Sequence, residues 1–186
     1  MPRFSNAAAL EWLRDGNQRF LERVKADEHR PADLVRGQDP EAVVLGCADS
    51  RVPPEIVFDV GLGELFVIRV AGGVANTASI ASVEYAVTQL GTRLVVVLAH
   101  EKCGAVSAAI QGGDAGRNLN RLMEYIEPAV QRCHEGDVND VARMNAKLNA
   151  ERLVAESEIL REAAESGDLR IATAFHRFTT GAVEFD

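Results

Sequence analysis

Several features are missing from the sequence, and each absence excludes a class of protein. No apolar run reaches roughly 18 residues, the length needed for a transmembrane helix, so the sequence predicts no membrane span. Basic residues are outnumbered, with 20 Lys and Arg against 28 Asp and Glu and a formal net charge of -8. That balance disfavours binding to nucleic acid or to an anionic membrane. Residues 1–9 carry no positive cluster followed by an apolar stretch, so we expect no secretory signal and a cytoplasmic protein.

Cysteine is also scarce. The three cysteines, Cys47, Cys103 and Cys133, form an odd and widely spaced set that excludes a disulfide framework. In a reducing compartment such residues are either buried and inert or used for metal binding and catalysis. A hydrophobic content of 47% excludes a disordered chain.

Three short apolar runs predict the strands of a buried sheet: Ala42 to Leu45, Leu65 to Val70 and Leu94 to Ala99. Each is rich in Val, Ile and Leu and lacks the polar alternation of a half-exposed strand. This composition is typical of parallel strands covered on both faces. Helical patterns separate the runs, because Pro53 and Pro54 can begin a short helix and apolar residues recur at helical spacing before Gly91.

The second half of the chain predicts two long helices and a closing pair of strands. The helices are expected at about 119–134 and 138–165, and the strands at 169–175 and 181–185. The fold class is therefore α/β: a central, mostly parallel β-sheet flanked by helices, with an N-terminal helical arm and a C-terminal strand and hairpin.

We expect one domain over residues 1–186, since 186 residues suffice to bury about 70% of the unfolded surface around one core. Residues 1–40 form its N-terminal helical arm and loop, and residues 41–186 form its α/β core. Ser5 can cap the helix of the arm, whose apolar residues share one side: Leu10, Leu13, Phe20, Leu21 and Val24.

Candidate metal ligands stand where two predicted strands end. Cys47 follows the first strand, and His100 and Cys103 follow the third. Sites in open parallel sheets form beyond the carboxyl ends of strands, where the strand order reverses. If the two strands are neighbours, these three side chains meet. Two thiolates and an imidazole suit zinc, and three protein ligands leave the open fourth position of a catalytic site.

Two stretches carry a resemblance to a known family. CADSRVPPEIVFDVGLGELFVIRVAG, from Cys47 to Gly72, and HEKCGAV, from His100 to Val106, resemble the β-class carbonic anhydrases. The resemblance implies one zinc ion per subunit on Cys47, His100 and Cys103. It also implies reversible hydration of carbon dioxide to bicarbonate and a proton by zinc-bound hydroxide. The expected assembly is a homodimer or a larger homo-oligomer.

The same resemblance assigns further residues of the site. Asp49 and Arg51 match the family's acid-base dyad: Asp49 can accept a hydrogen bond from the zinc-bound water, and Arg51 can hold that carboxylate ionised through a bidentate pair. The residues expected to contact the substrate match plant-type members of the family and are Gln38, Phe66, Tyr85 and Gly104. For Phe66 and Tyr85 the alternative is ordinary core packing.

The chain departs from the family's pattern at a few positions. Val44 stands where a gated subgroup carries tryptophan, and with Gln38 present this favours the plant-type state in which Asp49 stays paired to Arg51. The family's usual Tyr-Asp near the C-terminus is replaced by His176-Arg177, whose role the resemblance leaves open.

Two other functions are compatible with these residues. Carbonyl sulfide or carbon disulfide could be hydrolysed on the same scaffold, because a zinc-bound hydroxide can attack either linear molecule. A non-catalytic zinc-binding module is the alternative from a different class. The dyad of Asp49 and Arg51 argues against the module, since a structural metal needs neither a dyad nor an open position.

Overall fold

The computed structural model describes residues 6–25 and 35–186. The chain divides into two units, Met1–Gln38 and Asp39–Asp186. In the first unit, helix α1 (Asn6–Lys25) confirms the predicted arm helix, although the proposed cap Ser5 lies outside the described residues. No helix among the described residues is both long and apolar enough to cross a membrane.

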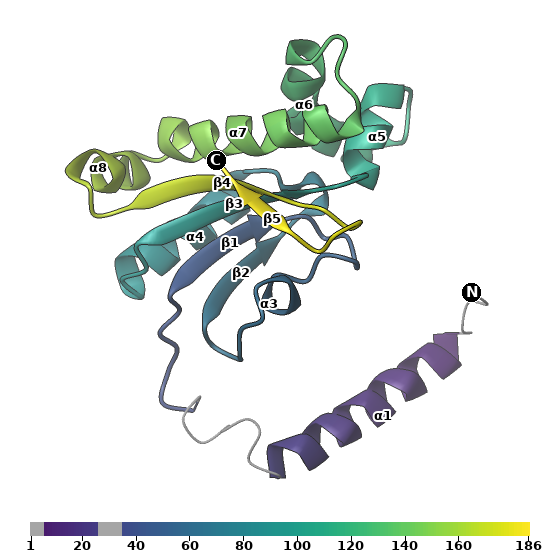
Figure 1. Ribbon diagram of the computed structural model, residues 1–186, viewed down its shortest axis with the longest axis vertical. Coiled ribbons are helices and arrows are strands. Elements are labelled where there is room, and N and C mark those ends of the chain that lie inside the picture. The colour runs from purple at the N-terminus through teal and green to yellow at the C-terminus, as the bar shows by residue number, and fades with distance from the viewer. Residues whose placement is uncertain (1–5, 26–34) are drawn as a thin grey trace. The chain divides into compact units, whose positions relative to one another are not determined.

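The second unit is built on a five-stranded sheet in the order β2-β1-β3-β4-β5 (Figure 1). Its strands are β1 (Ala42–Gly46), β2 (Leu65–Arg69), β3 (Leu94–His100), β4 (Arg170–His176) and β5 (Val183–Phe185). The first four pair in parallel, and β5 pairs antiparallel to β4. The predicted α/β class, the mostly parallel sheet and the C-terminal strand pair are confirmed.

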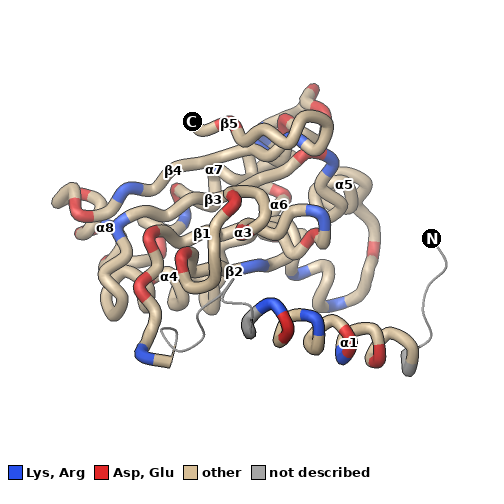
Figure 2. Tube along the Cα trace, turned by 60° about the horizontal axis from the view of Figure 1, so that its bottom comes forward, with Lys and Arg blue, Asp and Glu red and all other residues tan. Residues whose placement is uncertain are grey.

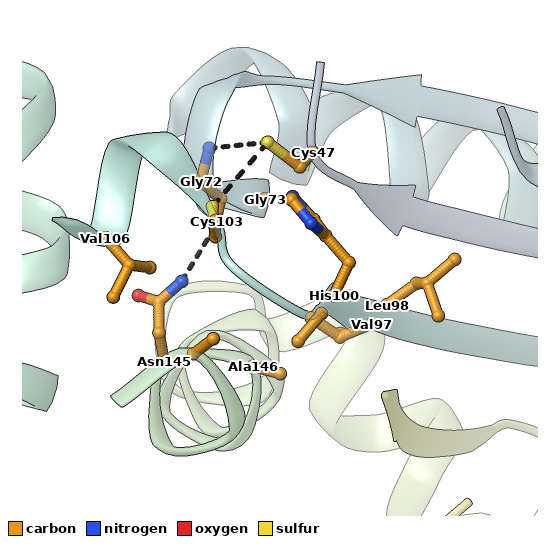
Figure 3. A pocket seen from close by; sticks show the side chains of 12 residues that line it. Cys47, Gly72, Gly73, Val97, Leu98, His100, Cys103, Val106, Asn145 and Ala146 are labelled. Carbon is orange, nitrogen blue, oxygen red and sulfur yellow. Dashed lines mark hydrogen bonds between the residues drawn. The ribbon is translucent and has the colours of Figure 1, made fainter. Parts of the chain in front are cut away.

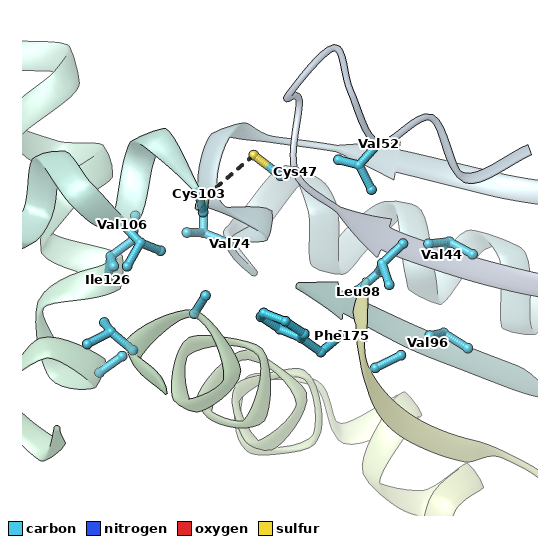
Figure 4. Packing of buried hydrophobic residues seen from close by; sticks show 14 residues of the cluster. Val44, Cys47, Val52, Val74, Val96, Leu98, Cys103, Val106, Ile126 and Phe175 are labelled. Atoms are coloured by element: carbon cyan, nitrogen blue, oxygen red, sulfur yellow. Dashed lines mark hydrogen bonds between the residues drawn. The ribbon is translucent and has the colours of Figure 1, made fainter. Parts of the chain in front are cut away.

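Both faces of the sheet are buried, as its apolar strands require. Val44, Val96 and Leu98 belong to one cluster of core side chains, and their sequence neighbours Val43 and Val97 belong to a second. The first cluster, drawn in Figure 4, is completed by side chains of helices α5 (Gly104–Gln111), α6 (Arg117–Arg132) and α7 (Val138–Glu156). The second takes residues from α4 (Thr77–Gln89), α7 and α8 (Glu158–Ser166).

The helices predicted at Pro53-Pro54 and before Gly91 are confirmed as α3 (Pro54–Val57) and α4. Pro53 precedes helix α3, and a 3-10 turn, η1 (Ala71–Gly73), follows β2. Helix α4 begins at an asparagine cap, where the Asn76 side chain accepts hydrogen bonds from the N–H groups of Ala78 and Ser79. The Asn76 cap satisfies two backbone N–H groups that would otherwise have no partner within the helix.

The prediction of a single long helix at 138–165 is wrong, because two helices, α7 and α8, occupy this range. Ser157 has extended backbone angles (φ -126°, ψ 115°) and ends α7. Its hydroxyl accepts a hydrogen bond from Leu160 N at 3.1 Å and pairs with Glu84 Oε1 at 2.6 Å. Serine competes for backbone hydrogen bonds in this way and therefore favours helix caps over helix interiors.

Candidate metal centre

The predicted site forms at the edge where the strand order reverses. The neighbours β1 and β3 run in parallel, while β2 lies on the far side of β1 and β4 on the far side of β3. Cys47 directly follows β1, and His100 is the last residue of β3. Cys103 caps the N-terminus of α5, three residues later. The expectation that the first and third strands are neighbours is confirmed.

The three side chains come together as a metal site would require. The ligand atoms of Cys47, His100 and Cys103 lie within 4.8 Å of one another, and all three residues are buried. The two sulfur atoms are 3.9 Å apart. Two sulfurs bound tetrahedrally at ~2.3 Å from zinc would be ~3.8 Å apart, so the spacing fits this ion.

The imidazole is oriented for coordination. His100 Nδ1 lies 3.0 Å from the carbonyl oxygen of Glu101, and that bond assigns the proton to Nδ1. Nε2 then carries the free lone pair, and it is buried with no hydrogen-bond partner among the described residues. Metal-ligating histidines commonly donate their second N–H to a carbonyl in this way. A cation bound at Nε2 would give this buried nitrogen the partner that it lacks among the described residues.

The surroundings of Cys47 favour a negative charge on its sulfur. A hydrogen bond from Cys103 lowers the pKa of Cys47 to about 4, while the same bond and burial raise the pKa of Cys103. Cys47 Sγ also accepts hydrogen bonds from Gly72 N at 3.2 Å and from Asp49 N at 3.4 Å. A bound cation would take up both sulfurs as thiolates, because metal binding releases the protons of its cysteine ligands.

Asp49 and Arg51 form a bidentate salt bridge beside the candidate ligands. Arg51 Nε donates to Asp49 Oδ1 at 2.9 Å, and Nη2 donates to Oδ2 at 2.7 Å. These bonds lower the pKa of Asp49 to about 2. Asp49 Oδ2 lies 4.0 Å from His100 Nε2. An ionised carboxylate, which can only accept hydrogen bonds, thus stands next to the candidate metal position.

An aromatic ring holds the arginine from the opposite side. The guanidinium carbon of Arg51 lies 4.5 Å from the centre of the Phe178 ring, and Nη2 also reaches Lys102 O at 3.3 Å. The Phe178 ring is 5.2 Å from that of His100. Sequence reasoning missed Phe178, because only the return of the β4–β5 hairpin brings residue 178 to residue 51.

Replacing Phe178 by leucine is expected to lower kcat/KM of the reaction carried out at this site about two- to fivefold, the value of an exposed cation–π contact. Arg51 would lose one of the contacts that hold its guanidinium, while the candidate metal ligands keep theirs. Steady-state kinetics and metal content, measured together, test this. Phe178→Tyr, which keeps the ring, is the control and should match the parent; equal rates for parent and Phe178→Leu would contradict the assignment.

The backbone beside Cys47 requires glycine. Gly72 has φ +77°, and an added Cβ would lie 2.7 Å from Ile126 Cδ1. Gly91 has φ +72°, but nothing lies within 4 Å of its Cβ position. The two positions share the left-handed backbone, but only Gly72 lies against a core side chain and takes part in hydrogen bonds with Cys47 and Asn145.

Gly72→Ala is therefore expected to lower the free energy of unfolding by about 1–3 kcal/mol more than Gly91→Ala, the usual cost of overpacking a core. Urea denaturation of the two variants in the same metal state measures the difference. Equal losses would mean that Ile126 moves aside without cost.

The residues predicted to contact substrate are found in different places. Phe66 in β2 pairs in register with Val43, four positions before Cys47, which is ~13 Å along a strand. Its ring lies 6.2 Å from that of Tyr85, which is 48% exposed. Within one chain these two side chains lie together but away from the ligand cluster. Their contact with substrate stays a prediction.

Gly104 and Gln38 are both exposed. Gly104 is the first residue of α5, so its N–H belongs to the first helical turn, where backbone donors have no partner within the helix. Gln38 is the last residue of the first unit. Its predicted role also stays a prediction.

His176 and Arg177 stand where the family usually has Tyr-Asp, and the structure gives the arginine a role. Arg177 pairs with Glu184 and so joins β4 to β5. His176 is buried, with its ring 5.4 Å from Phe178 and its Nδ1 unpartnered within the described part of the chain. Burial and the nearby His100 lower the pKa of His176, so it is neutral at physiological pH.

The fold and the site together define a class of protein: an open α/β sheet with a buried Cys-His-Cys cation site and an adjacent carboxylate–arginine pair. Comparisons with known proteins agree. A family model described as "Carbonic anhydrase" matches residues 42–183. Carbonic anhydrase 2 of Mycobacterium tuberculosis is 37% identical over 97% of this chain and 93% of its own length. A carbonic anhydrase of Mycolicibacterium smegmatis is 35% identical over 99% and 95%.

Solved structures show the same architecture. One matching chain comes from the crystal structures of two tetrameric β-carbonic anhydrases of Sordaria macrospora. The TM-score is 0.83 and the sequence identity 23%, and the match covers 95% of this chain and 96% of that one. The β-carbonic anhydrase of Coccomyxa, solved with acetazolamide, has a TM-score of 0.78 and 25% identity, covering 94% and 85%. The chain belongs to the carbonic anhydrase family, in its β class.

Proposed function

We propose that this protein catalyses the reversible hydration of carbon dioxide to bicarbonate and a proton, with one zinc ion per subunit held by Cys47, His100 and Cys103. The observation that carries the proposal is His100 Nε2, which has no hydrogen-bond partner in the described part of the chain and lies within 4.8 Å of two thiol sulfurs and 4.0 Å from Asp49 Oδ2. Zinc in such a site acts as a Lewis acid and makes water nucleophilic near neutral pH.

The chain's own residues orient the reactants. Asp49 Oδ2 accepts a hydrogen bond from the attacking water and so turns an oxygen lone pair toward carbon dioxide. Arg51, which keeps its charge at every physiological pH, fixes the carboxylate through two parallel bonds. The N–H of Gly104, in the first turn of α5, is proposed to donate to a substrate oxygen. The predicted substrate contacts of Gln38, Phe66 and Tyr85 belong to the same proposal, although within one chain Phe66 and Tyr85 lie away from the ligand cluster.

The test is a direct assay of carbon dioxide hydration, carbonyl sulfide hydrolysis and carbon disulfide hydrolysis on protein of measured zinc content. Hydration should be by far the fastest of the three reactions. A faster reaction with either sulfur compound would favour the alternative substrate. Zinc-loaded protein inactive toward all three gases would favour a non-catalytic module.

The plant-type subgroup is proposed as the finer assignment. Two features support it: Val44 in place of the gating tryptophan, and Asp49 held by Arg51 rather than released. With the pKa of Asp49 lowered to about 2, its pairing stabilises the fold fully above the unfolded pKa of about 4 and is lost only as the pH falls through about 2.

Carbon dioxide hydration is therefore expected to show no cooperative shutdown between about pH 5 and about pH 9, because Asp49 stays ionised and paired to Arg51 throughout this range. A stopped-flow pH profile, recorded beside crystal structures at the two ends of the range, checks this. A steep loss of activity on acidification, with Asp49 turned away from Arg51, would place the chain in the gated subgroup.

A cytoplasmic homodimer or larger homo-oligomer is proposed as the working form, with residues 1–40 as an arm on the α/β core of the single domain. Apolar side chains of α1 support the arm's role in assembly: Leu10, Leu13 and Leu21 are 50%, 60% and 40% exposed. The same helix also carries charged residues of both signs, among them Glu11, Arg14 and Asp15 (Figure 2). Tetrameric relatives from Sordaria macrospora point the same way.

Sedimentation equilibrium of the zinc-loaded protein should find no stable monomer at micromolar concentration. Substituting Leu10 and Leu13 by Ser should shift the distribution toward smaller species, because it removes apolar surface from the proposed contact. A stable, fully active monomer of the parent chain would contradict the proposal.

A further inference from the structure

Two buried asparagines lie on α7, and the first of them, Asn145, lines the pocket at the metal centre. Asn145 and Asn149 are one helical turn apart and only 3% and 1% exposed. Burying a primary amide costs free energy unless its donors and acceptor find partners. Both positions interrupt an otherwise apolar helix face that includes Ala142, Ala146 and Leu153. The polar pair therefore calls for an explanation beyond core packing.

The two amides form a directed chain of hydrogen bonds. Ala75 N donates to Asn149 Oδ1 at 2.6 Å, and Asn149 Nδ2 donates to Asn145 O at 2.7 Å and Oδ1 at 3.0 Å. Asn145 Nδ2 in turn donates to Gly72 O at 2.7 Å (Figure 3). Each bond fixes the orientation of the next amide, so the chain ends with a single donor aimed at one carbonyl.

That carbonyl belongs to the residue that contacts a candidate zinc ligand. Gly72 N donates to Cys47 Sγ at 3.2 Å, and Figure 3 shows Gly72 between Asn145 and the sulfur. Gly72 and Gly73 both have positive φ, at +77° and +64°. Glycine has no side chain to restrain its dihedral angles, so this turn depends on outside contacts to keep its N–H directed at the sulfur.

We propose that Asn145 is a positioning residue that acts on the metal through Gly72 and Cys47. It holds the Gly72 carbonyl, so that the Gly72 N–H keeps its bond to the Cys47 thiolate. A hydrogen bond to a ligating sulfur withdraws electron density from it, which leaves the metal a stronger Lewis acid. Asn149 supports the same bond one step further away. The inference rests on the proposed zinc-dependent function.

Cobalt substitution supplies a readout that a purely structural role would not move. In the cobalt-loaded protein, thiolate-to-metal charge transfer reports the electron density on sulfur. Asn145→Ala is expected to move this band to longer wavelength and to lower kcat/KM of the zinc enzyme about fivefold, the equivalent of about one neutral hydrogen bond. Asn149→Ala loosens Asn145 and also leaves Ala75 N without its acceptor, but it leaves the bond from Asn145 to Gly72 in place, so it should shift both quantities in the same direction by less.

The matched control is Ser157→Ala. It removes a buried hydroxyl with two hydrogen bonds at the other end of α7, and so costs stability without touching Gly72. Its cobalt band and kcat/KM should equal those of the parent. If Asn145→Ala and Asn149→Ala, both folded and metal-loaded, also match the parent, the asparagines serve the fold alone and the inference is overturned.

A failure of the proposed function would look different. A parent protein whose cobalt form has no thiolate charge-transfer band, or whose zinc form does not hydrate carbon dioxide, would refute the metal site itself. A normal parent with unchanged asparagine variants would refute only the positioning role. Should Asn145→Ala not fold, the milder Asn149→Ala decides the question alone: a parent-like band overturns the inference, and a shifted band supports it.

Discussion

Cys103→Ala should lose nearly all of its zinc and nearly all hydration activity. Among the described residues, three side chains form the candidate ligand cluster, and His100 Nε2 and Cys47 Sγ would be left as its ligands. Two ligands are one fewer than a catalytic zinc site needs, and the nearest carboxylate, Asp49, with Oδ2 4.0 Å from His100 Nε2, is held in its pair with Arg51. Elemental analysis and stopped-flow hydration on the same sample measure both losses.

The control for this variant is Cys133→Ala. Cys133 ends α6 and is half-buried, with its sulfur 3.8 Å from Asp140 O and outside the ligand cluster. Its removal should leave zinc and activity at parental levels. One full equivalent of zinc in purified Cys103→Ala would show that the ligand assignment is wrong.

Arg51→Ala is expected to keep its zinc but to lower kcat/KM for hydration about a hundredfold, the usual cost of misplacing a reacting group by about 1 Å. Asp49 would lose both bonds from the guanidinium and the largest cause of its low pKa, and would keep only the bond from the backbone N–H of residue 51. Arg51→Lys should recover little, because an ammonium cannot make the two parallel bonds of a guanidinium.

Arg132→Ala provides the comparison with an ordinary surface ion pair. Arg132 lies 3.9 Å from Glu151, with both side chains more than half exposed. Such pairs contribute little, so this variant should match the parent. If Arg51→Ala also hydrates carbon dioxide at the parental rate, the pair of Asp49 and Arg51 is likewise only a surface contact.

The sheet and the metal cluster could be predicted because their signals are local. Uninterrupted apolar runs indicate strands buried on both faces, and Cys47 and His100 stand directly where two such runs end. The general position of sites in open parallel sheets then brings those residues together. The adjacency of β1 and β3 had to be assumed, and the structure confirms it.

Residues whose role depends on contacts with distant parts of the chain could not be predicted from the sequence. Phe178 reaches Arg51 only through the hairpin after β4, and Asn145 reaches Gly72 only because α7 packs beside η1. A signal for Asn145 did exist: an asparagine pair with a spacing of four on an apolar helix face is unusual in a core. Helix α5 was missed because its small residues give little amphipathic pattern. The end of α7 at Ser157 was missed because the Ser157 hydroxyl also bonds to Glu84, which is distant in the sequence.

Zinc titration into metal-free protein, followed by stopped-flow hydration of carbon dioxide, tests the central claim most directly. The ligand set predicts activity that rises in proportion to added zinc and reaches its maximum at one ion per chain. The same titration of Cys103→Ala should stay flat. Full activity before zinc is added, or none after one equivalent has bound, would contradict the account.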